Sequence, residues 1–363
     1  MTGIQPTACD ECARRAWLLG ALAGHLEPVR GRIDELLALD DDALIEAVAG
    51  ADRDSLRREH ERFDPAVAGA EREAAGLNAV CRCHRTYPWR LHALPAPPAV
   101  LHFTGAPDRL FWHAGLHPVA IVGARRASAY GREMAHLIGR ELGATGVTVV
   151  SGMAFGIDAA AHEGALAGNG GTIAVLPSGA ERPYPAAHRP LHRRIVTTGV
   201  AVSELGPGIA PRRWMFPARN RIIAGLSGLT VVVQAREGSG ALLTAAWAKQ
   251  LGDPVGAVPG PAGATLSAGP HQLLRDGACL VTGGQDALDA LYGVGRATIE
   301  PSDRRGDLDP GHSALLDALA DGEEQMAAFA RAGLDADGGL GALAALELAG
   351  YVRRTAGGRY APR

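Results

Sequence analysis

The sequence predicts an α/β protein whose central part is a doubly wound parallel β-sheet. Between Val119 and Leu291, short apolar runs alternate regularly with segments whose apolar residues have helical spacing. The first two runs end abruptly, at Gly123 and at Ser151. Strand, polar turn, helix and strand form the repeating unit of parallel sheets, whose buried strands are continuously apolar. Ligands bind such sheets beyond the carboxyl ends of the strands, so the residues after each run are the functional candidates.

Residues 1–105 are predicted to form a small helical domain. Ala13 to Leu26 and Ile33 to Val48 both have apolar residues three and four positions apart, and Asp40 to Asp42 supply acidic charge suited to a helix N-terminus. Prolines between residues 88 and 98 end the regular structure. A short strand at Ala99 to Phe103 is expected to enter the next domain.

Four of the five cysteines lie in this N-terminal region as two close pairs, Cys9 with Cys12 and Cys81 with Cys83. If the ends of the domain meet, two such pairs provide what a closed tetrahedral zinc site needs. Four free thiols in a reducing cytoplasm are the alternative, and a disulfide is disfavoured there. A structural zinc ion is therefore left open, and no other cofactor is expected.

The central domain is predicted at residues 106–295. Its first strand is Val119 to Val122, followed by a helix that ends near Ala144. The later strands are expected at Val147 to Val150, Thr172 to Leu176, Val200 to Leu205, Leu229 to Gln234, Pro254 to Val258 and Cys279 to Val281. The later helices are expected at Ile157 to Ala167, Ala186 to Thr197, Arg219 to Leu226, Ala241 to Leu251 and Gln272 to Asp276.

The C-terminal part is predicted to be a linker and a winged helix. Residues 296–312 contain Pro301, Pro310 and mixed charges, as a linker does. Residues 313–363 then predict three helices and a glycine-tipped hairpin, the order of winged-helix domains. These elements are expected at Ala314 to Ala320, Glu323 to Ala332, Leu340 to Leu348 and Tyr351 to Tyr360.

Charge and motifs exclude several common classes. The chain has a single lysine, Lys249, and no GxxxxGK[ST] sequence, which excludes a P-loop ATPase. The turn after Val122 lacks the later glycines of the dinucleotide fingerprint, and no acidic residue follows Val150, which disfavours a nicotinamide or flavin dehydrogenase. No apolar run reaches the roughly 18 residues of a membrane span, and the N-terminus has no signal-peptide pattern. A soluble cytoplasmic protein is expected.

Arginines are concentrated in one segment of the chain, although the net charge is only −3. Between Arg182 and Arg221 there are eight arginines and one acidic residue, Glu204. Such a cluster is typical of a polyanion-binding surface, and a solvated arginine face is the alternative. Within it, Arg219, Asn220 and Arg221 follow Pro217 in the first turn of a predicted helix, where phosphate oxygens could accept hydrogen bonds. The alternative is a structural helix whose arginines pair with internal acids such as Glu204.

Two further glycine-containing turns lie at predicted strand ends. Ser239 and Gly240 begin a helix suited to hold a phosphate, and an ordinary N-cap by Ser239 is the alternative. Ser151 and Gly152 end a strand in a similar way. Asp158 and His162 are one helical turn apart, but no nucleophile or second zinc ligand accompanies them. A helix-start aspartate with a packed histidine is therefore preferred to a catalytic pair.

Six stretches of the central domain, in this order, resemble the DNA-processing protein A family (DprA, also called Smf). They are VAIVGARRASAYG (119–131), VVSGMAFGIDAAAHEGAL (149–166), TIAVLPSGAERPYP (172–185), FPARNRIIAGLS (216–227), EGSGALLTA (237–245) and VPGPAGATLSAGPHQLLRDGA (258–278). The resemblance implies an extended Rossmann fold with an N-terminal SAM-like helical domain and a C-terminal winged helix. It further implies a non-enzymatic, homodimeric protein that binds single-stranded DNA without base preference. Such a protein helps to load RecA recombinase during DNA uptake, natural transformation and homologous recombination.

The resemblance also implies DNA-contacting residues. These are Arg125, Ser128, Ser151, Gly152, Arg189, Arg219, Asn220, Arg221, Ser239 and Gly240. Phe155 stands where the family usually has arginine, which removes a charge but offers a ring for base stacking.

Two other functions are weighed against this one. A nucleotide-binding or nucleotide-hydrolysing protein of the phosphoribohydrolase type would need a PGGxGTxxE-type loop, which the sequence lacks. A sequence-specific regulator of double-stranded DNA would rest on the winged helix, but its third helix region, Asp335 to Gly350, contains acids and no Lys or Arg. This module is therefore expected to contact protein or its own chain, with Arg353, Arg354 and Arg359 as the only plausible phosphate contacts.

Overall fold

The computed structural model describes residues 8–115, 117–299, 308–348, 351–355 and 359–362. The chain divides into two units, Met1–Ile299 and Glu300–Arg363, which are described separately below. Residues 300–307, the middle of the predicted linker, lie outside the described residues.

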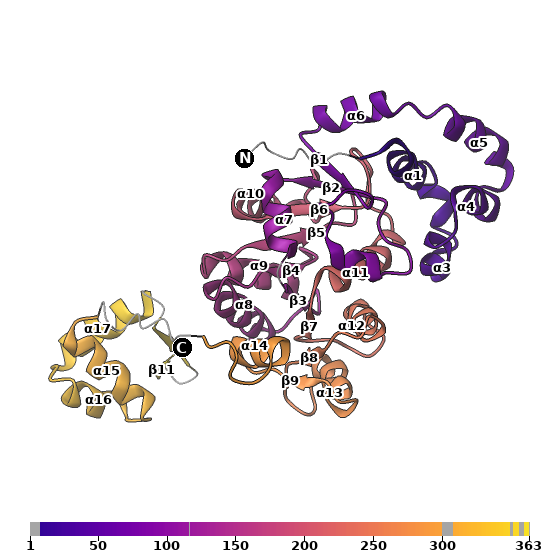
Figure 1. Cartoon of the computed structure of the whole chain (residues 1–363). Coiled ribbons are helices and arrows are strands. Elements are labelled where there is room, and N and C mark those ends of the chain that lie inside the picture. The colour runs from indigo at the N-terminus through magenta and orange to yellow at the C-terminus, as the bar shows by residue number, and fades with distance from the viewer. Residues whose placement is uncertain (1–7, 116, 300–307, 349–350, 356–358, 363) are drawn as a thin grey trace. The chain divides into compact units, whose positions relative to one another are not determined.

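A sheet of nine strands is the centre of the described part of the first unit (Figure 1). Its strand order is β1-β2-β6-β5-β4-β3-β7-β8-β9. The strands are β1 (Asn78–Cys81), β2 (Val100–Thr104), β3 (Val119–Val122), β4 (Val149–Ser151), β5 (Thr172–Val175), β6 (Val200–Ser203), β7 (Leu229–Val232), β8 (Val255–Ala257) and β9 (Cys279–Leu280). Strands β3 to β9 pair in parallel, whereas β2 is antiparallel to β6 and β1 to β2. The predicted parallel sheet is confirmed, with two antiparallel strands added at one edge.

The winding of the sheet reverses between β3 and β7. From β3 the chain proceeds outward through β4, β5 and β6, and it then returns to place β7 on the other side of β3. In sheets of this kind, the carboxyl ends of the two strands at the reversal leave a crevice between their connections.

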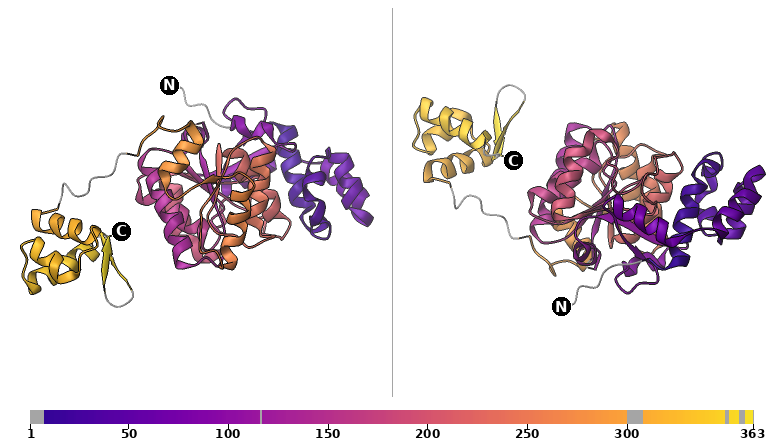
Figure 2. Two further views of the ribbon diagram at one scale, coloured as in Figure 1. Left: turned by 90° about the horizontal axis from the view of Figure 1, so that it is seen from below. Right: turned by 90° about the horizontal axis from the view of Figure 1, so that it is seen from above.

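Helices cover both faces of the sheet (Figures 1 and 2). One face carries α8 (Ala129–Ala144), α9 (Ile157–Ala167), α10 (Arg189–Thr198) and α14 (Gly284–Tyr292), and the other carries α11 (Met215–Leu226), α12 (Gly240–Gln250) and α13 (Ala268–Arg275). In β3, Val119 and Ile121 enter the core under α8 and α9, whereas Ala120 and Val122 enter the core under α11 and α12. Because both faces are covered, the strands read as continuous apolar runs, which is why they were predictable.

The N-terminal helices pack against the beginning of α11. These helices are α1 (Asp10–Ala21), α2 (Ala23–Leu26), α3 (Ile33–Leu37), α4 (Asp41–Val48), α5 (Arg53–Glu61) and α6 (Pro65–Ala74). Asp40 caps α4 by accepting a hydrogen bond from the Ala43 amide at 2.8 Å, as expected from its acidic N-terminus. Trp214 is buried among the helices and donates its ring N–H to the Ala23 carbonyl at 2.9 Å. The strand expected at Ala99 to Phe103 is present as β2, and β1, which the sequence did not predict, pairs with it at the edge of the sheet.

The remaining described elements are short or lie in the second unit. Between β2 and β3 lies α7 (Pro107–Gly115), and short 3-10 turns occur at Arg30–Arg32, Gly50–Asp52, Trp89–Ala93, Ala186–His188 and Thr265–Ser267. The second unit contains α15 (Pro310–Ala320), α16 (Gln325–Arg331), α17 (Ala336–Leu348), β10 (Val352–Arg354) and β11 (Tyr360–Pro362). The two strands form an antiparallel hairpin, and its predicted glycine tip, residues 356–358, lies outside the described residues.

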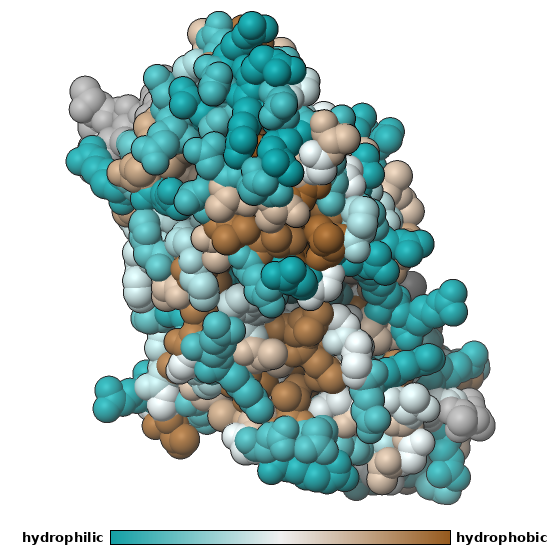
Figure 3. All heavy atoms as spheres, turned by 90° about the vertical axis from the view of Figure 1, so that its right-hand side faces the viewer, coloured by the Kyte–Doolittle hydropathy of each residue, from teal (hydrophilic) through white to brown (hydrophobic). Residues whose placement is uncertain are grey.

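The surface of the first unit is mixed in polarity. On the side that carries α11, α12 and α13, most side chains are hydrophilic, but hydrophobic ones gather near the middle of the face (Figure 3). Among the helices that the structure describes, none is both long and apolar enough to cross a membrane.

Candidate functional site

A cavity of about 450 Å³ lies at the carboxyl end of β3, where the winding of the sheet reverses. Its walls come from the turn after β3, the start of α9, and the first turns of α11 and α12. The lining residues are Val122, Gly123, Ala124, Arg125, Ala154, Asp158, Phe216, Pro217, Arg219, Asn220, Ile223, Ser239, Gly240, Ala241, Leu243 and Thr244. Of the predicted site residues, Arg125, Arg219, Asn220, Ser239 and Gly240 are brought together here.

Arg219 forms a buried, positively charged wall of this cavity. Its Nη1 donates to the carbonyls of Gly152 and Val175, both at 2.7 Å, which fixes the guanidinium between β4 and β5. Burial lowers the pKa of Arg219 to about 10, although the nearby Asp158 carboxylate opposes this shift. Burial in turn raises the pKa of Asp158, and Arg219 opposes that shift. Arg219 therefore contributes positive charge from a fixed position in the wall.

Gly152 and Ser151, two of the predicted contact residues, have structural roles. A Cβ atom on Gly152 would lie 1.9 Å from Nη1 of Arg219, so the guanidinium has its position only because residue 152 is glycine. The Ser151 hydroxyl is fully buried and donates to the Ile121 carbonyl at 2.6 Å. Ser151 therefore cannot contact a ligand through its side chain, and its predicted role is corrected to joining β4 to β3.

Arg221 has a structural role that contradicts the predicted DNA contact. Its side chain is 1% exposed, and its Nη2 donates to both carboxylate oxygens of Glu204 at 2.5 Å. Nη1 donates to the Ala96 carbonyl at 2.5 Å. The alternative of an internal pair with Glu204 is thus the arrangement observed. It links α11 to the end of β6 and to the segment before β2.

Aromatic rings and arginines flank the cavity on its exposed side. The guanidinium of Arg125 lies 4.8 Å from the ring centroid of Phe216, and the Tyr184 ring lies 5.5 Å from the Phe216 ring. Phe155 is 48% exposed and contacts His188, with 4.7 Å between ring centroids. His188 directly precedes Arg189, the exposed first residue of α10. One exposed ring, Phe155, therefore lies beside the start of the basic helix, and another, Tyr184, lies beside Phe216 of the cavity.

Six of the eight clustered arginines are exposed, and the two buried ones are Arg219 and Arg221. The exposed ones are Arg182, Arg189, Arg193, Arg194, Arg212 and Arg213. All lie in the connections that follow β5 and β6 or in α10. The predicted basic surface is therefore formed by the arginines other than Arg219 and Arg221.

Ser128 caps a helix and is also tied to the next strand of the sheet. Its hydroxyl accepts a hydrogen bond from the Gly131 amide at 3.1 Å and another from the Gln234 side-chain amide at 2.8 Å. The Gln234 oxygen accepts from the Ser128 amide at 3.0 Å. An amide both donates and accepts, so Gln234 suits this position. Ser128 is exposed but lies outside the lining of the cavity.

The N-terminus of α12 faces the cavity without a side-chain cap. Ser239 occupies the capping position, yet its hydroxyl makes no capping hydrogen bond and has no partner within the described residues. Asn220 donates to the Gly240 carbonyl at 3.0 Å, which holds the beginning of α12 against α11. Free N–H groups at a helix N-terminus attract anions.

Asp158 and His162 do not form a catalytic pair. The Asp158 carboxylate accepts a hydrogen bond from the Ala154 amide at 3.3 Å, whereas His162 contacts the Thr172 hydroxyl at 2.7 Å. Both side chains are buried. This agrees with the preferred interpretation of a helix-start aspartate and a packed histidine.

Sequence reasoning missed Tyr184, Phe216 and His188 as parts of this edge. The signal for the first two was the occurrence of aromatic residues among arginines between residues 182 and 221, which is a pattern of single-strand binding surfaces. His188 carried no such signal, because its place beside Phe155 depends on the tertiary fold.

The four N-terminal cysteines are also brought together by the fold. Their sulfur atoms lie within 4.8 Å of one another, at the start of α1 and the end of β1. This group is separate from the cavity.

Comparisons with known proteins agree on one family. A family model described as DNA recombination-mediator protein A matches residues 78–292. A putative DNA processing protein DprA from Mycobacterium tuberculosis is 45% identical over 207 residues, which is 57% of this chain and 51% of the relative. The DNA processing protein DprA from Bacillus subtilis is 35% identical over 240 residues, 65% of this chain and 80% of the relative. The chain thus spans about half the length of the mycobacterial relative.

Two solved structures are similar over most of their length. The DNA processing protein A from Streptococcus pneumoniae has a TM-score of 0.64 and 30% identity, covering 79% of this chain and 99% of that one. DNA processing protein A from Helicobacter pylori, described for its single-stranded DNA binding mode, has a TM-score of 0.53 and 28% identity, covering 59% and 95%.

Proposed function

Since the chain belongs to the DNA recombination-mediator protein A family, we propose that it binds single-stranded DNA along the carboxyl edge of its sheet, without base preference. The observation that carries this proposal is the cavity at the reversal of the sheet. It combines the uncapped N-terminus of α12 with the Arg219 guanidinium and the exposed Arg125. The similar protein from Helicobacter pylori, which is described as binding single-stranded DNA, supports the same ligand.

The chemistry of this edge fits a flexible phosphate chain. Arginines and helix N–H groups bind phosphate oxygens without reading the bases. The rings of Phe155, Tyr184 and Phe216 offer stacking surfaces, and stacking tolerates any base because every base has a π-face. Bases stacked on these rings would leave their phosphates near Arg125 and Arg189. We propose Phe155, Arg125 and Arg189 as direct contacts, with Ser128 and Gly152 as supports.

Fluorescence anisotropy with labelled oligonucleotides at several salt concentrations tests this proposal. Wild type is expected to prefer single strands over duplexes and to lose affinity steeply as salt increases. The double variant Arg125→Ala/Arg189→Ala should flatten the slope of log affinity against log salt by about 1.4, from about 0.7 for each lost phosphate contact on a single strand.

Arg275→Ala is the matched control for that variant. Arg275 is exposed and ends α13. The chain then enters the amino end of β9, so Arg275 lies away from the carboxyl edge where DNA is proposed to bind. The salt slope of Arg275→Ala should equal that of wild type. If wild type fails to bind single strands at low salt, DNA is not the ligand. If Arg275→Ala flattens the salt slope as much as the double variant does, the net charge of the chain, and not this edge of the sheet, determines DNA affinity.

A small nucleotide is the second candidate ligand, because a cavity of about 450 Å³ lies within the usual size range of small-molecule sites. Calorimetric titration with mononucleotides, followed by analysis for released base or phosphate, distinguishes it from DNA. We favour binding over catalysis because Asp158 and His162 are bonded to different partners and no nucleophile joins them in the described residues.

The biological role proposed for the chain is to load a RecA-type recombinase onto single strands during DNA uptake and recombination. The test is recombinase ATP hydrolysis on strands coated with single-strand-binding protein. The wild-type chain should shorten the lag before recombinase ATP hydrolysis begins, and the Arg125→Ala/Arg189→Ala variant should not. An unchanged lag with wild type would refute the mediator role while leaving DNA binding intact.

We also propose that the chain forms a homodimer. The hydrophobic side chains gathered on one face of the first unit support this, because such patches mark interaction surfaces (Figure 3). Light scattering after size-exclusion chromatography should give twice the chain mass of 37.6 kDa. A single-chain mass at all concentrations would contradict it.

The flanking parts are proposed to be a SAM-like helical domain and a winged helix. Helices α15 to α17 followed by the β10–β11 hairpin support the second assignment. The third helix, α17, contains Asp337 and Glu347 and has no Lys or Arg. We therefore propose that it serves protein contacts.

A further inference from the structure

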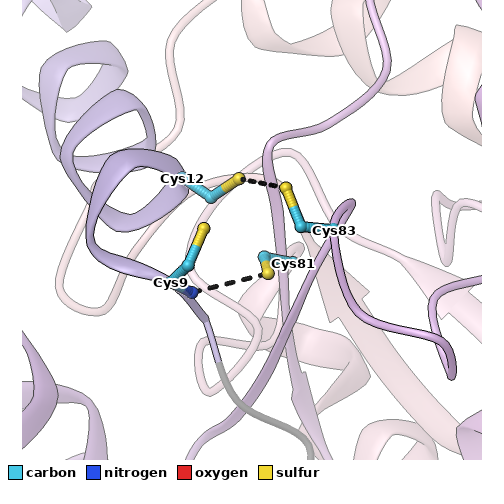
Figure 4. Close-up of side chains that lie close together, drawn as sticks. All are labelled: Cys9, Cys12, Cys81 and Cys83. Carbon is cyan, nitrogen blue, oxygen red and sulfur yellow. Dashed lines mark hydrogen bonds between the residues drawn. The ribbon is translucent and has the colours of Figure 1, made fainter.

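Two segments far apart in the sequence meet at four cysteine sulfurs (Figure 4). Cys9 and Cys12 lie at the start of α1, and Cys81 and Cys83 lie at the end of β1 and in the turn after it. All four sulfur atoms lie within 4.8 Å of one another, and Sγ of Cys12 lies 3.7 Å from Sγ of Cys83. The fold thus answers the question that the sequence left open, namely whether the two pairs meet.

The spacing of the sulfurs suits a tetrahedral metal ion. With a Zn–S bond of about 2.3 Å, tetrahedral geometry places sulfur atoms about 3.8 Å apart. The distance between Cys12 and Cys83 is close to this value, and the others need only a small contraction. All five cysteines of the chain are unbridged in the structure.

The start of α1 supports negatively charged sulfur at Cys9, although burial raises the pKa of Cys12. The backbone N–H of Cys9 donates to Sγ of Cys81 at 3.4 Å, the kind of support that orients metal ligands. Cys9 is the capping residue of α1 and Cys12 lies in its first turn, so these two cysteines are at the positive end of a helix dipole. Cys12 and Cys81 are buried, whereas Cys9 and Cys83 are exposed, which leaves a path by which an ion can enter.

The apolar cluster around the four cysteines is small. It consists of Cys12, Cys81, Ala16, Ala79, Ala99 and Val100, with Ala8 at its border. Alanines bury little apolar area, so the hydrophobic effect gives this contact modest strength. A metal ion would close a chain loop of about 70 residues at this point, and closing a long loop constrains the unfolded chain strongly.

From these observations we propose that Cys9, Cys12, Cys81 and Cys83 bind one Zn²⁺ in a closed, structural site that fastens α1 to the first strand of the sheet. Four protein ligands leave no open position, so the ion has no catalytic role. The proposal is independent of DNA binding, because none of the four residues lines the cavity.

Metal analysis of the full-length chain, purified without chelator or affinity metal, tests the proposal first. One zinc per chain is expected, and it should be released when an organomercurial blocks the thiols. Cys12→Ser and Cys81→Ser should each lose most of the zinc. Cys279→Ser is the matched control, because Cys279 is exposed in β9, and it should keep the full content.

Cobalt substitution and proteolysis complete the test. Replacement by Co²⁺ should give the intense visible absorption of a tetrahedral thiolate site, and removal of metal should accelerate cleavage in the α1 segment while leaving the sheet intact. Metal-free wild type, iron in place of zinc, or a disulfide between any of the four cysteines in freshly purified chain would each overturn the proposal. These measurements on wild type hold even if the serine variants fold poorly.

Discussion

Arg219 and Arg221 differ in role because different groups lie opposite them. Arg219 meets the carbonyls of Gly152 and Val175 at the cavity wall, so its charge faces a space that a ligand can enter. Arg221 meets the Glu204 carboxylate in the interior, so its charge is neutralised. Only Asn220 separates the two arginines in the sequence, yet only Arg219 can act electrostatically on a bound strand.

Arg221→Ala should therefore destabilise the fold. Removal of the guanidinium leaves the Glu204 carboxylate buried and unpaired, which costs about 3–5 kcal/mol of unfolding free energy. Urea denaturation measures this. The double variant Arg221→Met/Glu204→Leu removes both charges and should recover most of the loss. A fully stable Arg221→Ala that no longer binds single strands would instead restore the direct-contact role.

Buried histidines should make the fold sensitive to mild acid. Burial lowers the pKa of His162 to about 3 and that of His102 to about 4, from an ordinary value of 6.5. Below about pH 6.5 the unfolded chain takes up protons that these folded histidines do not. The unfolding free energy should thus decrease as pH falls from about 6.5 toward 4, by up to about 1.4 kcal/mol per pH unit for each histidine.

Urea midpoints at about pH 7 and pH 5.5 check this dependence. Wild type should lose stability on acidification, and His162→Gln should lose distinctly less. Burial raises the pKa of Asp158, which acts in the opposite sense because the folded state then binds the extra proton. Equal losses of stability in wild type and His162→Gln would show that His162 is not held neutral in the folded chain.

At the scale of elements, α8 and α12 begin with serines in opposite situations. The Ser128 hydroxyl closes the first turn of α8 and joins Gln234, whereas the Ser239 hydroxyl at the start of α12 has no partner in the described residues. A cap that already bonds its own helix stabilises the fold. A helix start without such a bond is available to a ligand.

Ser128→Ala and Ser239→Ala should consequently separate stability from binding. Ser128→Ala should lower the unfolding free energy by about 1 kcal/mol, the usual value of an N-cap. Ser239→Ala should change stability little but weaken single-strand affinity roughly tenfold, as loss of a hydrogen bond to a charged phosphate costs about 1.5 kcal/mol. Denaturation and anisotropy on both proteins give the comparison, and equal effects in the two variants would contradict this assignment.

The sequence predicted elements where local pattern decides them. The strand at Val119–Val122 and the helix at Ile157–Ala167 have their predicted bounds, because buried parallel strands and their connecting helices have clear periodicities. The strand at Asn78–Cys81 was missed, since four residues at an antiparallel edge carry little pattern. Burial of Arg221 was undecidable, because it depends on Glu204, 17 residues away along the chain, reaching the same point in space.

At the scale of the whole molecule, the proposed activities belong to separate parts. The cavity, the exposed arginines and the cysteine cluster all lie within the first unit, which has its own hydrophobic cores. The second unit has a core of its own, built around residues such as Leu315, Phe329 and Leu343. Among the residues that the structure describes, each core is built from side chains of its own unit.

Deletion of residues 313–363 should therefore reduce single-strand affinity less than tenfold. The truncated chain keeps every proposed DNA contact. The removed α17 has acidic residues, which repel phosphates, and no Lys or Arg to bind them. Anisotropy on full-length and truncated chains at one salt concentration measures the difference. Arg354→Ala in the full-length chain is the control, because it removes one hairpin arginine without removing the unit. The Arg354 guanidinium lies over the Tyr360 ring in the hairpin. A loss greater than tenfold on deletion, matched by Arg354→Ala, would assign the hairpin a DNA-binding role.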